Sequence, residues 1–227
     1  MITPAEWSAI FNSLWVASAA LLASLPAGVA LGWLLARKRF PGKMLLEVLV
    51  LLPLVMPPVV TGYILLVAFS RRGWLGSAIH RWLGADVLFT GKAMVIAAAV
   101  VGLPLLVRSV RLAMEAVDPR LEQAARTLGR TRLATFFEVT LRLAWPGVVT
   151  GSALFFARAL GEFGATRLVA LNADGTRTIA LEVFQQLEQP GAGDWAVMRL
   201  AVFSIVLSAA CLAACEVLSR RHREAAP

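Results

Sequence analysis

Two ionisable side chains lie inside an apolar run in the second half of the 227-residue chain. Arg158 and Glu162 are four residues apart, so on a helix they share one face. An ionised side chain at mid-membrane costs about 2.5–3.5 kcal/mol on insertion scales, so both need partners or water. Two interpretations follow: a pair that neutralises both charges, or a pair that shapes a gate or the passage of an anion. Gly161 and Gly164 belong to the same candidate pathway.

Other residue types that carry chemistry lack the required spacing. A phosphate-binding P-loop needs a glycine, four intervening residues and then Gly-Lys-Ser/Thr. At Gly91-Lys92, Asp86 stands where the first glycine belongs and Ala93 replaces the hydroxyl residue. The two histidines are far from any cysteine or carboxylate cluster with ligand spacing. The sequence therefore predicts no ATPase site, metal site or cofactor site of its own.

A polar segment at 118–129 has the pattern of a short amphipathic helix. Asp118 is a suitable N-cap, Pro119 fits the first turn, and Gly129 can end the helix in a left-handed conformation. An apolar stripe at three-and-four spacing is formed by Leu121, Ala124, Ala125 and Leu128, while Glu122, Arg126 and Arg130 are polar. This apolar area is too small to bind lipid strongly but suits a groove on another protein. The alternative is an ordinary amphipathic connector.

Long apolar runs surround these features. The chain is 59% hydrophobic, above the roughly 45–50% of soluble domains. Runs of about 20 residues, the length that spans a bilayer, occur near 9–36, 44–69, 93–113, 145–168 and 197–218. We therefore predict an all-α, polytopic transmembrane helix bundle with about five spans, forming a single domain over 1–227.

Proline and glycine mark irregular positions within the spans. Pro53, Pro57 and Pro58, followed by Gly62, must bend or break the second span, because each proline removes a backbone donor. In lipid a broken helix is tolerated mainly beside protein or water, so Pro57, Pro58 and Gly62 are candidate pathway residues, with a plain structural kink as the alternative. Small residues at helix-packing spacing predict close backbone approach elsewhere: Gly28 with Gly32, and Gly147 with Gly151.

Basic residues predict the orientation. The net charge is +8, but Lys and Arg form short clusters between apolar runs, which excludes a nucleic-acid-binding face. Fourteen of them fall at 37–43, 108–142 and 220–223, and seven fall in the alternate connections. Because cytoplasmic loops are enriched in Lys and Arg, we expect the N-terminus outside and the C-terminus inside the bacterial inner membrane. Membrane lipid is then the solvent of the bundle.

The polar connection resembles a known family motif. Gln123-Ala124-Ala125, then Gly129, Val139, Leu141 and Pro146-Gly147 resemble the EAA loop of binding-protein-dependent ABC importer permeases. Gln123 stands at the usual glutamate, with Glu122 beside it, and Arg142 replaces a common proline. The resemblance implies the MetI-like permease fold and a cytoplasmic loop at about 114–143. Its coupling helix (121–129) would sit in a cleft of a separate ATPase that holds ATP-Mg.

Further matches concern the transported substrate. The run from Ala157 to Thr166 resembles the equivalent segment of permeases for molybdate, tungstate and sulfate. Matches that favour molybdate lie along almost the whole chain: 4–7, 40–43, 52–58, 70–73, 176–179 and 189–191. Tungstate and sulfate remain alternatives. A membrane enzyme or a scaffold is the rival from another class, but neither explains the loop pattern.

The resemblance also implies partners. They are a second copy of the chain in a homodimeric channel, cytoplasmic ABC ATPase subunits, and a periplasmic binding protein that delivers the oxyanion. The connection from about 171 to 195 is expected outside, with a helix over 178–187, as a docking site for that binding protein or as a surface flap.

Overall fold

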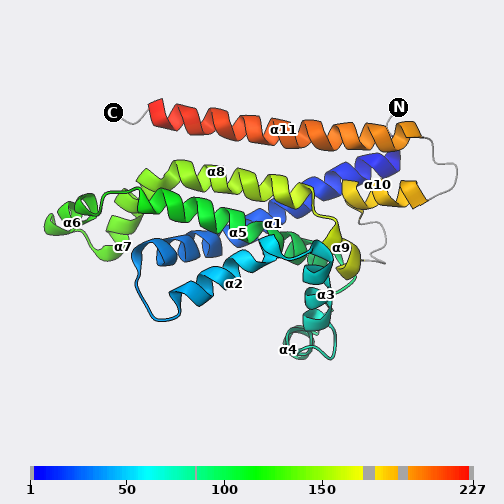
Figure 1. Ribbon diagram of the computed structural model, residues 1–227, viewed down its shortest axis with the longest axis horizontal. Coiled ribbons are helices and arrows are strands. Elements are labelled where there is room, and N and C mark those ends of the chain that lie inside the picture. The colour runs from blue at the N-terminus through cyan, green and yellow to red at the C-terminus, as the bar shows by residue number, and fades with distance from the viewer. Residues whose placement is uncertain (1–2, 85, 171–176, 189–193, 225–227) are drawn as a thin grey trace.

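The computed structural model describes residues 3–84, 86–170, 177–188 and 194–224. Every regular element in these ranges is a helix, which confirms the all-α prediction. Figure 1 shows the arrangement. The elements are α1 (Pro4–Arg37), α2 (Lys43–Val55), α3 (Pro58–Phe69), α4 (Trp74–Leu83), α5 (Gly91–Glu115), α6 (Pro119–Thr127), α7 (Arg132–Thr135), the π-helical η1 (Phe136–Thr140), α8 (Leu141–Leu160), α9 (Gly164–Val169), α10 (Ile179–Glu188) and α11 (Asp194–Glu224).

Helix α5 is the centre of the bundle and packs against both α1 and α8. Its buried face is made largely of small and branched apolar residues, including Ala97, Ala98, Val101 and Val110. The predicted glycine pairs lie at these contacts: a Cβ on Gly32 would be 2.6 Å from Val110 Cγ1, and one on Gly151 would be 2.9 Å from Ser109 Cβ. Because these glycines have no side chain, the helices can approach as closely as expected in a membrane bundle.

The predicted apolar runs are found as helices. Within the described residues, three helical stretches are long and apolar enough to cross a membrane: α1, α5 and the continuous stretch Arg132–Leu160. Together α2 and α3 are long and apolar enough to form a fourth span, but the two helices are bent by 114° relative to each other. The predicted break at the prolines is therefore confirmed. The fifth run lies within α11, whose apolar section Val197–Cys211 is shorter.

The fourth span differs from its prediction. A continuous helix over 145–168 was expected, but α8 ends at Leu160 and the short helix α9 begins at Gly164. The reason is local: Glu162 Oε1 accepts a hydrogen bond from the Ala165 backbone N–H at 2.8 Å. Such a bond between a side chain and the backbone competes with helix continuation, and an apolarity count cannot detect it.

The N-terminus of α1 is capped and is linked to the last helix. Thr3 and Glu6 form a capping box, in which the Thr3 N–H donates to Glu6 Oε2 at 2.7 Å and the Glu6 N–H donates to Thr3 Oγ1 at 3.3 Å. Glu6 is 1% exposed, and its Oε1 accepts from Arg199 Nη2 of α11 at 2.5 Å. One carboxylate therefore starts α1 and holds α11 against it.

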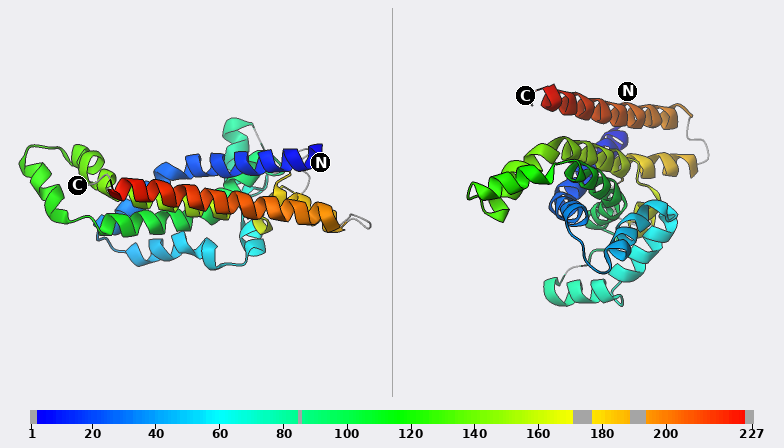
Figure 2. Two further views of the ribbon diagram at one scale, coloured as in Figure 1. Left: turned by 90° about the horizontal axis from the view of Figure 1, so that it is seen from above. Right: turned by 60° about the vertical axis from the view of Figure 1, so that its left-hand side comes forward.

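The bundle has two distinct ends. Figures 1 and 2 show α6, α7, the end of α1 and the C-terminal end of α11 at one end, and the N-terminus with α10 at the other. The elements that carry the larger set of basic residues therefore meet at one end. The expected helix over 178–187 is α10, whereas residues 171–176 and 189–193 of the same connection lie outside the described residues.

Candidate functional site

Helix α6 is built as its sequence predicts. Asp118 Oδ1 accepts from the Arg120 N–H at 2.8 Å, and Pro119 occupies the first turn. At the other end Gly129 adopts φ +87°, the Gly129 N–H donates to Arg126 O, and the Arg130 N–H donates to Ala125 O, both at 3.1 Å. These two bonds form a Schellman motif, which satisfies carbonyls left free at the helix end.

The predicted apolar stripe of α6 is uncovered. The side chains of Leu121 and Leu128 are 49% and 85% exposed, and α6 contains no buried residue. Leu128 therefore buries little apolar surface within the described chain, and Leu121 buries about half of its own. The stripe is therefore free to pack against another protein.

Glu122, on the opposite face of α6, ties that helix to the bundle. Its Oε1 lies 2.9 Å from Arg37 Nη2 at the end of α1 and accepts from Thr140 Oγ1 of η1 at 2.7 Å. Arg37 Nη2 also donates to Val117 O at 2.8 Å, in the turn before α6. Glu122 therefore bonds α6 both to α1 and to the segment that leads into α8. Sequence reasoning placed Glu122 in the coupling helix but could not identify its partners, because they lie 85 and 18 residues away.

The segment after α6 contains an element that the sequence did not predict. From Arg132 to Leu160 the chain is continuously helical, but Phe136–Thr140 is π-helical, with wider hydrogen bonding than an α-helix. The Phe136 ring packs edge-on against Trp33 of α1, with 5.8 Å between centroids. Thr140, the residue bonded to Glu122, belongs to this wide turn. Such turns are often found at functional sites.

The predicted pathway residues gather where two helices are interrupted. We call the interruptions between α2 and α3 (56–57) and between α8 and α9 (161–163) the paired break. A Cβ on Gly164 would be 2.5 Å from Pro58 Cβ, and a Cβ on Gly62 would be 2.7 Å from Ala165 Cα. The starts of α3 and α9 therefore touch backbone to backbone. Pro57 is the N-cap of α3. Gly161 is the C-cap of α8, and among the described residues a Cβ added to it would come within 4 Å only of backbone oxygens of α8.

Arg158 and Glu162 are paired at this break. Arg158 Nη1 lies 2.7 Å from Glu162 Oε2, and the Glu162 side chain is 1% exposed. The pair does not lie in mid-helix as expected, since Arg158 is in the last turn of α8 and Glu162 follows its C-cap. With one oxygen on Arg158 and the other on the start of α9, Glu162 fixes the break. The neutralising interpretation agrees with this geometry, and a role in anion passage stays a prediction.

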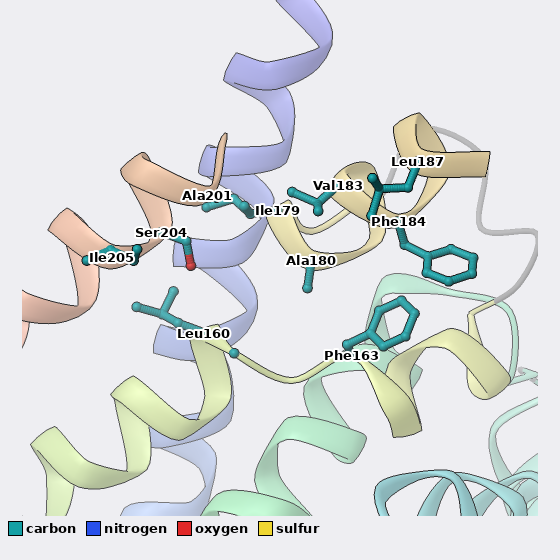
Figure 3. A pocket seen from close by; sticks show the side chains of 11 residues that line it. Leu160, Phe163, Ile179, Ala180, Val183, Phe184, Leu187, Ala201, Ser204 and Ile205 are labelled. Carbon is teal, nitrogen blue, oxygen red and sulfur yellow. The ribbon is translucent and has the colours of Figure 1, made fainter. Parts of the chain in front are cut away.

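A cavity of about 470 Å³ adjoins the paired break, between the end of α8, α10 and α11. Figure 3 shows Phe163 and Phe184 side by side at one side of it, with ring centroids 5.0 Å apart. Of the eleven described residues that line it, only Ser204 has a polar side chain. The described lining of this cavity therefore offers an oxyanion almost no hydrogen-bond donor.

Solved structures share this fold. A chain of a bacterial ABC transporter involved in the import of alginate matches with a TM-score of 0.71 at 18% identity, covering 96% of this chain and 80% of that chain. A chain of the MetNI methionine ABC transporter, in an inward-facing conformation, matches with a TM-score of 0.69 at 17% identity, covering 97% and 95%. The fold is thus that of an ABC importer membrane subunit, MetI-like as expected.

Sequence relatives make the class specific. Residues 28–224 match the family described as "Binding-protein-dependent transport system inner membrane component", and the chain belongs to that family. It is 48% identical to the molybdenum transport system permease protein ModB of Escherichia coli K12, over 100% of this chain and 99% of that protein. The ModB protein of Haemophilus influenzae is 48% identical over 96% of both chains. The sulfate transport system permease protein CysT of Salmonella typhimurium is 36% identical over 91% of this chain and 76% of that protein.

Proposed function

We propose that the chain is the membrane-spanning permease subunit of an importer for molybdate, driven by ATP hydrolysis on separate ATPase subunits. The observation that carries the transport role is the structure of α6, a capped helix with an exposed apolar stripe. On the opposite face of α6, the Glu122 carboxylate bonds to Arg37 of α1 and to Thr140 of η1. The substrate assignment is supported by 48% identity to molybdenum permeases over the full chain, against 36% to a sulfate permease.

In this mechanism α6 binds to the ATPase through its apolar stripe, which consists of Leu121, Ala124, Ala125 and Leu128. Closure of the ATPase moves α6, and the bonds of Glu122 to Arg37 and Thr140 carry the movement to α1 and to the long α7–η1–α8 stretch. The far end of that stretch is the paired break. A shift of α8 there changes how α9 and α3 meet, and this contact serves as the gate.

The assembly follows from the family. An ABC importer permease works with an ATPase and a periplasmic binding protein, and a solved alginate transporter is bound to its periplasmic protein. We assign a homodimer to the channel, with the N-terminus outside and α6 in the cytoplasm. The concentration of basic residues at the α6 end supports that orientation.

Competition during uptake tests the substrate. Reconstituted vesicles carrying the permease, its ATPase and its binding protein should accumulate labelled molybdate. Unlabelled tungstate at equal concentration should compete, because it is a tetrahedral dianion of nearly the same size, whereas sulfate should not. Displacement of labelled molybdate by an equal concentration of sulfate would show that the substrate assignment is wrong.

A glycine pair tests the coupling role of α6. Gly129 and Gly42 both have positive φ, +87° and +85°, and neither has an atom within 4 Å of an added Cβ. A Gly→Trp change therefore costs similar backbone strain at both, about 1–2 kcal/mol. We expect G129W to leave the protein in the membrane but to uncouple ATP hydrolysis from uptake, and G42W to transport normally. Equal transport by the two variants would contradict the assignment.

A further inference from the structure

A second cavity, of about 560 Å³, separates α6 from the bundle. Its wall is formed by the end of α1 and the connection after it, one face of α6, and the α7–η1 segment. Unlike the apolar cavity beside the paired break, it is lined by charge. Five cationic side chains contribute to its wall: Arg37, Lys38, Arg39, Arg126 and Arg132.

The positive charge of this cavity is mostly unneutralised. Among its described lining residues, Glu122 is the one carboxylate, and its Oε1 is committed to Arg37 and Thr140. The other four cations have no carboxylate at ion-pair distance within the described chain, although Lys38 Nζ lies 5.4 Å from the centre of the Trp33 ring. Like charges that surround one cavity repel one another, so an anion placed among them is attracted by all four.

The direction in which the cavity opens separates it from the ATPase seat. The residues of α6 that line it, Pro119, Glu122, Gln123 and Arg126, follow three-and-four spacing along one face. Each residue of the apolar stripe, from Leu121 to Leu128, follows one of these cavity-lining residues by two positions. At about 100° per residue this is a rotation of about 200°, so the apolar stripe and the cavity-lining face lie roughly opposite each other. A protein seated on the apolar stripe therefore leaves the cavity between α6 and the membrane end of α1.

The lining chemistry specifies the ligand. Arginine and lysine donate charge-assisted hydrogen bonds that suit phosphate-like oxyanions, and guanidinium groups bind two oxygens at once. Trp33 and Lys38 adjoin the end of a membrane-spanning helix, where tryptophan and basic residues mark the membrane–water boundary. An anion at this depth comes either from the phosphate of an anionic lipid or from free oxyanion in the cytosol.

We propose that this cavity is a binding site for a tetrahedral oxyanion, which bridges the end of α1 to α6 and α7 beside the Glu122 bonds. Its occupancy adds a second link between the coupling helix and the bundle. The inference rests on the proposed function only in that the α6 end must face the cytoplasm.

Two triple variants test the site. R39Q/R126Q/R132Q removes three cavity cations, and R108Q/R120Q/R142Q removes three cations from the same end that do not line it. All six arginines are exposed and have no ion pair within the described chain, so both triples should fold. The full-length chain is purified with and without its ATPase. Native mass spectrometry then measures retention of phosphatidylglycerol against phosphatidylcholine, and calorimetry measures binding of inorganic phosphate and of molybdate.

We expect at least one anionic probe to bind the unaltered chain, at least about tenfold more weakly in the cavity triple and equally well in the control triple. Retained phosphatidylglycerol identifies a lipid phosphate, and calorimetric heat identifies a free oxyanion. Equal losses in the two triples, no binding of any probe, or loss of the bound anion when the ATPase is added would overturn the inference; the last would place acidic ATPase side chains in the cavity. Because none of these measurements involves uptake, failure of molybdate transport leaves their outcome unaffected.

Discussion

The two ends of the long α7–η1–α8 stretch are held in opposite ways. At the α6 end the contacts are polar and run through side chains: Glu122 bonds to Arg37 and to Thr140, beside a charged cavity. At the paired break the contacts are backbone to backbone, with Gly62 and Gly164 against Ala165 and Pro58, beside an apolar cavity. Polar bonds exchange partners with little change in shape, whereas interlocked backbones must move together or separate. The first end suits receiving a movement, and the second suits stopping a passage.

The largest expected effect comes from filling the paired break. Changing Gly62 to Val places its Cβ 2.7 Å from the Ala165 Cα, which is backbone and cannot rotate away. Overpacking of this kind costs about 1–3 kcal/mol, and we expect molybdate uptake to be lost because α3 and α9 separate. Vesicle uptake and thermal unfolding in detergent measure the two effects.

Gly161→Ala is the control inside the paired break: Gly161 is a predicted pathway residue, but a Cβ there would lie 3.9 Å from backbone oxygens of α8 and would not touch α3 or α9. It should transport as the unaltered chain does. If G62V also transports normally, the close contact of α3 with α9 has no part in the gate.

A smaller effect on uptake, a reduction and not a loss, is expected at the α6 end. Changing Glu122 to Ala removes the ion pair to Arg37 and the hydrogen bond to Thr140, each a charged bond worth about 1.5–3 kcal/mol. Because α6 keeps both its caps, we expect ATP hydrolysis to continue while uptake per ATP falls. Phosphate release and labelled molybdate, measured in the same vesicles, give this ratio.

Glu138→Ala serves as the comparison for Glu122. Within the part of the chain that the structure describes, its carboxylate pairs with Arg130 alone, 3.2 Å away, and both side chains are about half exposed. An exposed pair contributes little, so E138A should keep the normal ratio of uptake to ATP hydrolysis. Should E138A reduce the ratio as much as E122A does, general loss of negative charge, not the link to α1, would explain both.

The smallest effect is expected away from both ends, at the connection between α4 and α5. The hydrogen-bonded Arg71 guanidinium holds the pKa of Asp86 below its ordinary value, and His80 contributes less. The pair therefore stabilises the fold above the ordinary aspartate pKa, and this contribution disappears as the pH falls through the lowered value. Both groups are exposed, so this contribution is small, and we expect D86N to leave uptake unchanged and to lower the Tm only slightly at neutral pH. A drop in uptake would assign this connection a role in transport.

Local patterns predicted the elements well. The caps and stripe of α6 were readable because Asp118, Pro119 and Gly129 act within a few residues of the helix they delimit. The bend at Pro57 and Pro58 was readable because proline lacks a backbone donor. Apolar run length located three spans, the bent fourth and the shorter apolar section of α11, although it did not show that α8 ends at Leu160.

The features that were not predicted depend on distant partners or on competition within the backbone. Glu122 forms an ion pair with Arg37, which lies 85 residues earlier, and no local pattern near either residue indicates this pairing. The end of α8 depends on whether the Glu162 carboxylate bonds to the Ala165 N–H, and the π-helical turn at Phe136–Thr140 depends on packing against Trp33. Tertiary contacts act at Glu122 and at Phe136, whereas at Glu162 a side-chain bond to the backbone three residues later ends the helix.

The carboxylate of Glu6 has a consequence for biosynthesis. It lies in the first turn of α1, and its partner Arg199 lies in α11, 193 residues later in the chain. The bond between them can therefore form only after α11 has been synthesised, so it belongs to a late step in the assembly of the bundle. A chain truncated before α11 would leave the Glu6 carboxylate without Arg199 at the start of α1.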